Sequence, residues 1–277
     1  MPTLKDWLTD AVAQLKAADI PSARLDAEII LAHCLRQPRT FVHAHDNEEL
    51  DSRTTEIADA RLALRLGRVP IAYIIGHKDF YGRRFLVTTA TLIPRPESET
   101  LIDMLKKLAP KNTSLLGETT FTIVDVGTGS GCLGITAKLE IPDSRVTLID
   151  VSPHALKVAS SNATRLHADV HILKSDLLSD YPLRAHVIVA NLPYVDPLWT
   201  TSAETAHEPA LALFADNNGL ALIKKLIDQA ASHLYDKGHL LLEADPRQHA
   251  DIIRFATSKK RFSTVTTDGF CILLRKN

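Results

Sequence analysis

The sequence has few cysteines, little charge of either sign in excess and no long apolar run. Its three cysteines, Cys34, Cys132 and Cys271, stand far apart and form no Cys-x-x-Cys pair. This pattern argues against a disulfide framework and a structural zinc site, and it favours a reducing compartment. A formal net charge of -1 gives no overall attraction to nucleic acid or anionic membranes. No apolar run approaches the roughly 20 residues of a membrane span, and the first residues lack a signal core. We therefore expect a cytoplasmic protein without a membrane partner or a metal.

The chain begins with a predicted helical domain over residues 1–68. Apolar residues recur there at helical spacing, and Thr3 and Asp6 are placed as a capping pair. A second helix is predicted between residues 21 and 38, and a third between residues 47 and 67. This small bundle contains no cluster of catalytic residue types. We therefore expect it to serve substrate recognition or structural support.

Residues 69–97 are predicted to form a β-hairpin linker. Two short strands are expected around the glycine-containing turn between Phe80 and Phe85. Two prolines then enclose Arg95, which makes a stiff segment, and Ser98 is a predicted N-cap for the following helix. The segment is interpreted as a rigid linker that also forms a wall of an active-site mouth. Arg95 is therefore a candidate for a contact at this mouth, whereas the sequence alone assigns no role to Phe80 and Phe85.

Residues 98–277 alternate between short β-branched strands and helical segments, a pattern typical of a parallel sheet. After a polar loop over residues 110–120, strands are predicted near 121–126, 145–150, 170–173, 187–190 and 239–243. Asp268-Gly269 predicts a terminal hairpin, which adds two strands. The expected fold is therefore α/β and Rossmann-like, with a seven-stranded, mostly parallel sheet and an antiparallel hairpin at its end.

A glycine-rich loop follows the first of these strands. Gly127, Gly129 and Gly131 let the backbone approach a ligand closely, and Asp150 ends the next strand, where an acid accepts hydrogen bonds from ribose hydroxyls. The third glycine comes one residue too early for the dinucleotide pattern Gly-x-Gly-x-x-Gly. Asp125 would repel phosphate but suits a cationic amino-acid group. These features favour S-adenosylmethionine over NAD and over a purely structural loop.

Further cofactor contacts are expected at the end of the third strand. Asp176 is placed to accept a hydrogen bond from an adenine amino group, and Leu177 to pack on the ring; the alternative for either is an ordinary cap. The predicted cofactor-binding residues are Asp125, Gly127, Thr128, Gly129, Ser130, Gly131, Asp150, Val151, Asp176, Leu177 and Asn191.

The chain leaves the fourth strand through Asn191-Leu192-Pro193-Tyr194. Because proline cannot continue a central strand, this segment lies at a carboxyl end of the sheet, where open α/β folds bind ligands. An amide side chain and an aromatic face at such a point suit the capture of a planar group with an NH2; the alternative is a simple strand end and turn. These four residues are the predicted catalytic residues.

With both motifs in view, the chain resembles the PrmC/HemK family of glutamine N5-methyltransferases, which modify peptide-chain release factors. The resemblance covers nearly the whole chain and includes Arg68-x-Pro70-x-x-Tyr73-x-x-Gly76, Phe80-Tyr81-Gly82, Leu92-Ile93-Pro94-Arg95-Pro96-Glu97, Asp125-Val126-Gly127-Thr128-Gly129-Ser130-Gly131, Asn191-x-Pro193-Tyr194 and Glu208-Pro209-Ala210-Leu211. It implies the fold of class I S-adenosylmethionine-dependent methyltransferases. It also implies methyl transfer from S-adenosyl-L-methionine to the glutamine of the GGQ motif in class 1 release factors, which would modulate translation termination.

The sequence departs from the family pattern at the active-site loop. Leu192 stands where the family has the first proline of Asn-Pro-Pro-Tyr, and Asp245 in Glu243-Ala244-Asp245 stands where the family usually has the glycine of Glu-x-Gly. The resemblance implies that the Asn side-chain oxygen and the next backbone carbonyl accept the two hydrogens of the target amide. Leu192 also has that carbonyl, so activity is expected to survive with a less preorganised loop.

Two other functions remain open at this point. Amino-methylating enzymes of nucleic acids use similar loops on a flipped base, but a neutral chain does not favour that reading. A degenerate fold that binds the cofactor or a ribosomal partner without turnover is suggested only by Leu192.

The expected partner is the GGQ domain of class 1 release factors, without direct nucleic-acid binding, and the protein is expected to be a monomer.

Overall fold

The computed structural model describes residues 1–110, 120–258 and 260–277. The chain forms two compact units: Met1–His77 with Ser202–His207, and Lys78–Thr201 with Glu208–Asn277. The polar loop predicted over residues 110–120 falls almost entirely outside the described residues. Within the described part of the chain, no helix has both the length and the apolar character that crossing a bilayer requires.

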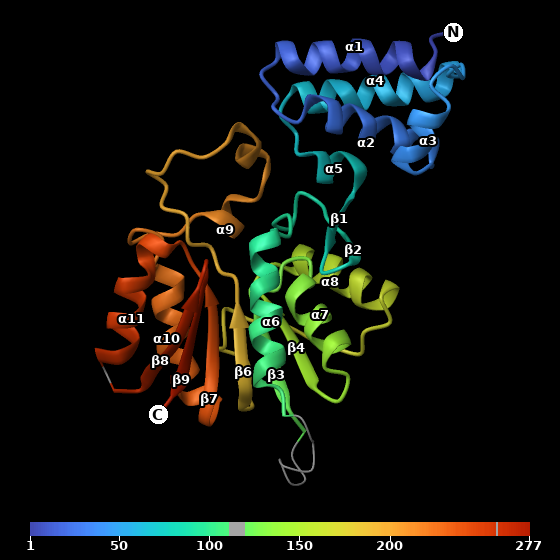
Figure 1. The fold of residues 1–277 in the computed structure, drawn as a ribbon. Coiled ribbons are helices and arrows are strands. Elements are labelled where there is room, and N and C mark those ends of the chain that lie inside the picture. Colours follow the sequence, from blue (N-terminus) through green and yellow to red (C-terminus); the bar gives the residue numbers. More distant parts are fainter. Residues whose placement is uncertain (111–119, 259) are drawn as a thin grey trace. The chain divides into compact units, whose positions relative to one another are not determined.

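The first unit is a helical bundle (Figure 1), as the sequence predicts. Its helices are α1 (Leu4–Ala17), α2 (Ala23–Leu35), α3 (Arg39–Ala44), α4 (Ser52–Leu66) and α5 (Ile71–Ile75). Thr3 and Asp6 form the predicted capping box at the start of α1. The third predicted helix begins later than expected, because Asp51 rather than Asn47 caps α4 by accepting a hydrogen bond from the Thr54 amide. The short helices α3 and α5 were not predicted, and α5 lies within residues 69–97, which were expected to form the β-hairpin linker.

A distant segment of the chain is tied to this bundle through Arg65. The Arg65 Nε atom lies 2.7 Å from Asp26 Oδ2, and Nη2 lies 3.1 Å from Glu204 Oε1 in the 3-10 helix η3 (Ala203–His207). The His207 ring also bonds the Gly67 carbonyl at 2.9 Å. These bonds explain why residues 202–207 belong to the first unit.

The second unit opens with a two-stranded hairpin of β1 (His77–Phe80) and β2 (Arg83–Leu86). Both strands are four residues long. Phe80 and Phe85 are fully buried and meet edge to face, with ring centroids 6.1 Å apart. Both rings therefore belong to the core of the second unit.

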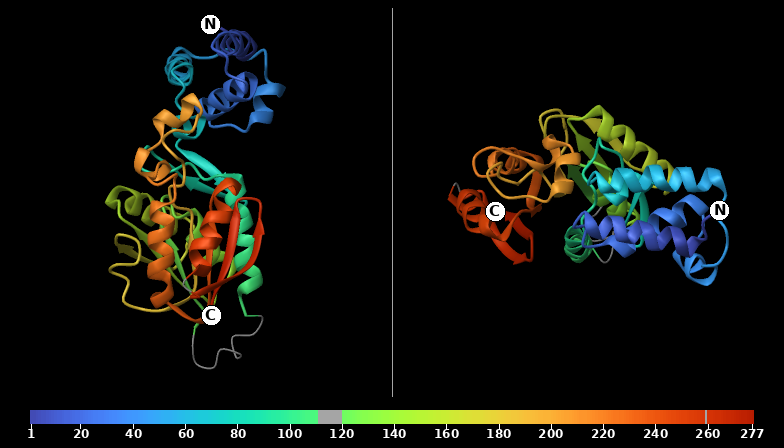
Figure 2. Two further views of the ribbon diagram at one scale, coloured as in Figure 1. Left: turned by 90° about the vertical axis from the view of Figure 1, so that its left-hand side faces the viewer. Right: turned by 90° about the horizontal axis from the view of Figure 1, so that it is seen from above.

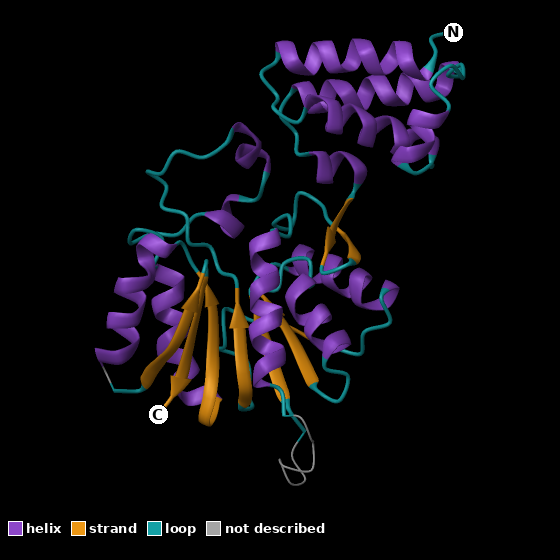
Figure 3. Cartoon of the chain, in the orientation of Figure 1, coloured by secondary structure: helices purple, strands orange, loops and turns teal. Residues whose placement is uncertain are grey.

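The main sheet has seven strands (Figure 3) in the order β5-β4-β3-β6-β7-β9-β8. The strands are β3 (Thr122–Val126), β4 (Arg145–Asp150), β5 (His171–Lys174), β6 (Ala185–Ala190), β7 (Leu234–Glu243), β8 (Phe262–Asp268) and β9 (Cys271–Lys276). The first five run parallel, and β9 is antiparallel to both β7 and β8. The predicted Rossmann-like α/β fold with a terminal hairpin is confirmed.

Helices cover both faces of this sheet (Figures 1 and 2). They are α6 (Glu99–Leu108), α7 (Cys132–Glu140), α8 (Pro153–Arg165), α10 (Ala221–His233) and α11 (His249–Ser258). The short helix α9 (Ala210–Leu213) lies beyond the carboxyl ends of the strands (Figure 1), and two short turns are η1 (Pro96–Ser98) and η4 (Pro246–Gln248). Along β6, Val187 and Val189 pack with α6, α7 and α8, whereas Ile188 and Ala190 pack with α10 and α11. Burial on both faces explains why β6 reads as a continuous apolar run.

Candidate active site

The register of three adjacent strands brings the predicted site residues together. Val126 on β3 pairs with Ala190 on β6, and Ala190 pairs with Leu242 on β7. The residue after each of these positions therefore lies at the same carboxyl edge of the sheet. From β3 the chain adds β4 and β5 on one side and then β6 and β7 on the other side, so the topological switch point lies between β3 and β6. Open α/β sheets bind ligands at such a point.

The glycine loop between β3 and α7 has an open side. Gly129 adopts a left-handed backbone with φ of +55°, and a Cβ placed on it would meet no atom within 4 Å. Gly131 also lies in the left-handed region, but its Cβ would meet Ile135 Cδ1 at 2.6 Å and Ala159 Cβ on α8 at 3.2 Å. Gly131 therefore serves packing against α8, whereas Gly129 leaves backbone accessible to a ligand.

Asp125 is a fully buried carboxyl group behind this loop. Its Oδ2 atom accepts hydrogen bonds from Thr128 Oγ1 at 2.6 Å and from the Gly134 amide at 2.8 Å. Its Oδ1 atom is buried and has no hydrogen-bond partner among the described residues. Burial raises the pKa of Asp125 to about 6 against the effect of these two hydrogen bonds. The group therefore carries negative charge at neutral pH at the base of the loop.

Asp150, at the end of β4, fixes the loop from the neighbouring strand. Its Oδ2 atom accepts a hydrogen bond from the Gly129 amide, and its Oδ1 atom one from the Ser152 amide, each at 2.9 Å. Burial raises the pKa of this carboxyl above its ordinary value. Because a carboxylate oxygen accepts more than one hydrogen bond, Asp150 can hold the loop and still receive a hydroxyl group. Val151 beside it is 47% exposed.

The two residues predicted at the end of the third strand are arranged differently. Asp176 is exposed, and its Oδ2 atom forms an ion pair with Lys225 Nζ on α10. Leu177 is buried and takes a left-handed φ of +52°. Any ligand hydrogen bond to Asp176 therefore shares its carboxylate with Lys225.

The Asn191–Tyr194 loop leaves β6 directly beside the glycine loop. Asn191 Nδ2 lies 3.1 Å from Ser98 Oγ, and the Tyr194 hydroxyl donates to Glu243 Oε1 at 3.4 Å. Leu192 is buried in the core between the sheet and α10. Burial and the negative charge of Glu243 raise the pKa of Tyr194 well above its ordinary value, so its hydroxyl remains a proton donor.

Three residues that support this loop were not predicted as site residues. Ser98 makes no capping bond, contrary to expectation, because its hydroxyl faces Asn191. Glu243 ends β7, and Gln248 Nε2 donates to the Tyr194 carbonyl at 2.8 Å. The position of Glu243 at the end of a predicted strand could have marked it as a site residue. Only the strand order, however, shows that β7 lies next to β6.

Arg95 is engaged within the protein. Its guanidinium pairs with Glu208 Oε1, and Glu208 Oε2 accepts a hydrogen bond from the Ile93 amide at 3.2 Å. The Glu208 side chain is only 3% exposed. The resemblance motifs around residues 93–95 and 208 therefore meet in one ion pair, which holds the proline-rich segment in place.

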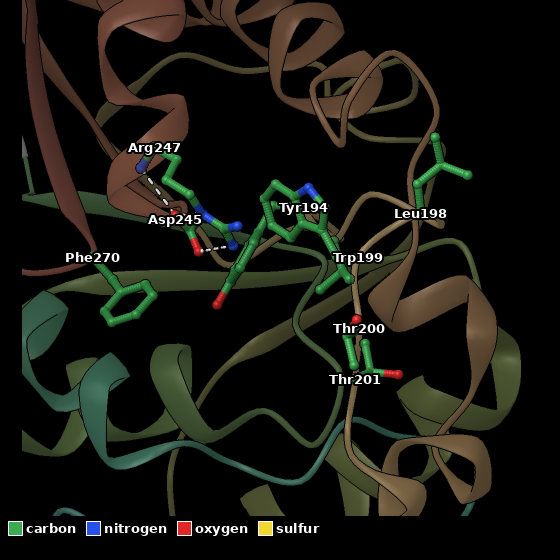
Figure 4. Close-up of a pocket in the computed structure, with 9 residues that line it drawn as sticks. Tyr194, Leu198, Trp199, Thr200, Thr201, Asp245, Arg247 and Phe270 are labelled. Carbon is green, nitrogen blue, oxygen red and sulfur yellow. Dashed lines mark hydrogen bonds and ion pairs between the residues drawn. The ribbon is translucent and has the colours of Figure 1, made fainter.

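A pocket of about 580 Å³ opens beside Tyr194 (Figure 4). The Arg247 guanidinium carbon lies 3.8 Å from the centre of the Trp199 ring, and Arg247 also pairs with Asp245 at 2.8 Å. The lining residues are Tyr194, Val195, Leu198, Trp199, Thr200, Thr201, Asp245, Arg247 and Phe270. This volume lies within the range of small-molecule and side-chain binding pockets.

The sheet order, the glycine loop and the strand-end acids define a class I methyltransferase. A methyltransferase small domain model matches residues 98–209, and a PrmC N-terminal domain model matches residues 6–76. A solved methyltransferase from Pyrococcus furiosus shares the fold at 17% identity, with a TM-score of 0.52 over 78% of this chain and 95% of that chain.

Curated relatives identify the family. The chain is 40% identical to the release factor glutamine methyltransferase of Koribacter versatilis, over 88% of this chain and 89% of the relative. It is 35% identical to the enzyme of that name from Deinococcus radiodurans, over 88% and 86%. The protein belongs to the release factor glutamine methyltransferase family.

Proposed function

We propose that this enzyme transfers a methyl group from S-adenosyl-L-methionine to the side-chain amide nitrogen of the glutamine in the GGQ motif of class 1 release factors. The observation that carries the proposal is the placement of Asn191 and Tyr194 beside an open glycine loop at the switch point of the sheet. Family membership supplies the substrate class. The reaction would take place in the cytoplasm, where release factors work, and would need neither a metal nor a second subunit.

The residues at the carboxyl edge fit S-adenosylmethionine. The unpartnered, buried Oδ1 atom of Asp125 and its negative charge favour a cationic amino-acid group near the loop. Gly129 offers backbone without a side chain, and Asp150 offers acceptor capacity for ribose hydroxyls. The residues proposed to hold the cofactor are Asp125, Gly127, Thr128, Gly129, Ser130, Gly131, Asp150, Val151, Asp176, Leu177 and Asn191.

The bound cofactor would supply an electrophilic methyl group and would leave as the neutral thioether when its S–CH3 bond breaks. The amide nitrogen would form the new N–CH3 bond and release one proton to water, and the protein would orient this nucleophile. An amide nitrogen is a poor nucleophile because its lone pair is delocalised into the carbonyl group. We infer that the Asn191 side-chain oxygen and the Leu192 carbonyl accept the two hydrogens of the target amide and so fix its nitrogen in place. Such positioning and electrostatic stabilisation require no strong base. Tyr194 would pack against the amide, and the Pro193 ring would stiffen the turn.

The pocket beside Tyr194 is a suitable place for side chains that flank the target glutamine. It adjoins the proposed catalytic loop through Tyr194 itself, and it presents the Trp199 ring and the Arg247 guanidinium. A bound segment of the release factor would then reach the loop from this side.

The proposal is tested by transfer of labelled methyl from S-adenosylmethionine to a purified class 1 release factor. We expect label on the wild-type factor and none on a variant in which the glutamine of the GGQ motif is alanine. An Asn191→Ala enzyme should retain its fold and lose about 100-fold or more in kcat, as expected when a transition-state hydrogen bond is removed. Label on RNA or DNA instead would favour base methylation. Cofactor binding without any labelled product would favour the degenerate fold.

A further inference from the structure

Glu243 is a buried carboxyl group that the proposed chemistry does not use. Its residue is 1% exposed, and it ends β7 next to the strand that carries Asn191. Its Oε2 atom has no hydrogen-bond partner of standard geometry among the described residues. Burying a carboxyl group costs free energy unless it is well paired. A cost of this kind at the edge of the catalytic loop points to a functional role.

The side chains around Glu243 are all groups that can donate a hydrogen bond. Burial raises the pKa of the Glu243 carboxyl group, and the nearby polar groups of Ser98, Tyr194 and Asn191 oppose that rise. The Tyr194 hydroxyl lies 3.4 Å from Oε1. Asn191 Nδ2 also lies 3.1 Å from Ser98 Oγ. The four side chains form one small polar cluster beneath the loop.

The chemistry of a carboxylate decides which way the Asn191 amide faces. An ionised carboxylate only accepts hydrogen bonds, whereas an Asn side chain has an accepting oxygen on one side and a donating nitrogen on the other. Glu243 therefore selects the nitrogen of Asn191 as the inward atom. The side-chain oxygen is left on the opposite side of the planar amide group.

Ser98 completes the cluster from a rigid element. It closes the turn η1, which begins at Pro96 directly after Arg95, the partner of Glu208, and its residue is 2% exposed. Its amide donates to the Arg95 carbonyl at 3.2 Å. The hydroxyl is thus held at a fixed point next to Asn191 Nδ2.

We propose that Glu243 and Ser98 are positioning residues, which lock the Asn191 amide with its nitrogen inward and so present its oxygen to the target amide of the substrate. The inference rests on the proposed function and adds a specific cause for the orientation of Asn191. A glutamine at position 243 would offer an NH2 group, allow Asn191 to turn over and place a donor toward the substrate.

Exchanging the donor and acceptor groups of Asn191 and Glu243 provides the test. Glu243→Gln should fold normally and lose about 10-fold or more in kcat, with KM for the release factor changed by less than about 2-fold, because the binding surface is unaltered. Asn191→Asp should lose about 100-fold or more, because two carboxylates then face each other. The Asn191→Asp/Glu243→Gln double variant restores a donor–acceptor pair and should recover about 10-fold over Asn191→Asp.

Ser98→Ala and Glu97→Gln serve as comparisons. Ser98→Ala removes one of the two inward partners of Asn191 and should cost less kcat than Glu243→Gln. Glu97 is exposed and acts on Glu243 only through its charge, so Glu97→Gln should keep kcat within about 2-fold of wild type. An equal loss in Glu97→Gln would show that local charge matters and would overturn the hydrogen-bond explanation. A double variant no better than Asn191→Asp would also overturn it.

A second readout does not depend on activity. The side-chain NH2 of Asn191 can be assigned by NMR from its absence in Asn191→Asp. We expect its hydrogens to exchange slowly in the wild type and at least about 10-fold faster in Glu243→Gln. Equal exchange rates would refute the proposal. If the wild type failed to methylate a release factor, the proposed function would be wrong. The exchange rates would still test whether Glu243 fixes the orientation of the Asn191 amide.

Discussion

The side chain of Leu192 occupies the space in which a Cβ atom on Gly127 would lie, at a separation of only 2.8 Å from Leu192 Cδ2. Gly127 also has a left-handed φ of +73°. The leucine that replaces the usual family proline therefore packs directly onto the first glycine of the cofactor loop. The Leu192 side chain packs in the core below the sheet edge. Leucine in place of proline therefore adds apolar packing but removes the restriction that a proline ring places on the backbone φ angle.

This packing predicts the effect of restoring the proline. Leu192→Pro removes buried apolar atoms, which costs about 1–3 kcal/mol, and returns about 0.4–1 kcal/mol through the unfolded chain. We expect a small net loss in the free energy of unfolding, measured by urea denaturation, with kcat at or above the wild-type value. Leu192→Ala has no such compensation and should lose about 2–4 kcal/mol. Equal stability of the two variants would contradict the packing account.

Gly129 and Gly269 form a matched pair for testing the cofactor loop. Both have a left-handed φ, +55° and +53°, and a Cβ on either would meet nothing within 4 Å. Alanine at either position should therefore cost a similar amount of stability, about 1 kcal/mol. Only Gly129→Ala should weaken S-adenosylmethionine binding in calorimetry, by about 10-fold or more, because its Cβ projects into the open side of the loop. Equal affinity in both variants would remove Gly129 from the proposed site.

Local patterns in the sequence were sufficient to predict most of the fold. The β-branched runs, the glycine loop and the Asp268-Gly269 turn each depend on neighbours in the chain, and the structure confirms the strands and the hairpin that they predict. Helix starts were less predictable where two capping residues competed, as Asn47 and Asp51 do before α4. Both residues lie in the same polar stretch, and only the packing of the helical bundle decides which of them becomes the N-cap.

The candidate site was predictable only in part, for a physical reason. The glycine loop and the Asn191 loop sit at strand ends, which a pattern reveals. Ser98 lies 93 residues from its partner Asn191, and Glu243 acquires its neighbours only because β7 pairs with β6. Long-range contacts of this kind depend on strand order. The role of Phe80 could not be assigned from the sequence for the same reason, since its burial depends on packing with Phe85 and α6.

Asp125 should give the protein a pH-dependent stability with a definite sign. Its pKa is raised by burial to about 6 from an ordinary value of 3.8, so between these values the folded state binds more protons than the unfolded state. The free energy of unfolding therefore falls as the pH rises from about 4 to 6, by up to about 3 kcal/mol. Asp125→Asn should lack this fall and exceed the wild type in stability at pH 7.

Urea denaturation of the cofactor-free proteins between pH 4 and 8 measures this difference. The exposed Asp143 supplies the control, since Asp143→Asn should follow the wild-type pH profile. Asp125→Asn should also bind S-adenosylmethionine more weakly, because it loses the negative charge at the base of the loop. Parallel profiles for Asp125→Asn and the wild type would show that the carboxyl group is not protonated on folding.

The helical unit contains a buried ion pair whose loss should be costly. The side chains of Arg65 and Asp26 are 6% and 4% exposed, with Nε and Oδ2 2.7 Å apart. Arg65→Met leaves the Asp26 carboxylate buried without its partner, which should cost about 3–5 kcal/mol. The Arg24–Glu28 pair in the same unit has an arginine that is 68% exposed, so Arg24→Met should cost at most about 1 kcal/mol.

Tryptophan fluorescence can follow this unit alone. Trp7 is buried in the helical core and its indole nitrogen donates to Asp59 at 2.8 Å, whereas Trp199 belongs to the second unit. In a Trp199→Phe background, the denaturation midpoint reported by Trp7 should fall sharply for Arg65→Met and little for Arg24→Met. If Arg65→Met/Asp26→Leu regained most of the lost stability, the cost would lie in the unpaired carboxylate. If the double variant were as unstable as Arg65→Met, the arginine would act through its packing and its bond to Glu204 instead.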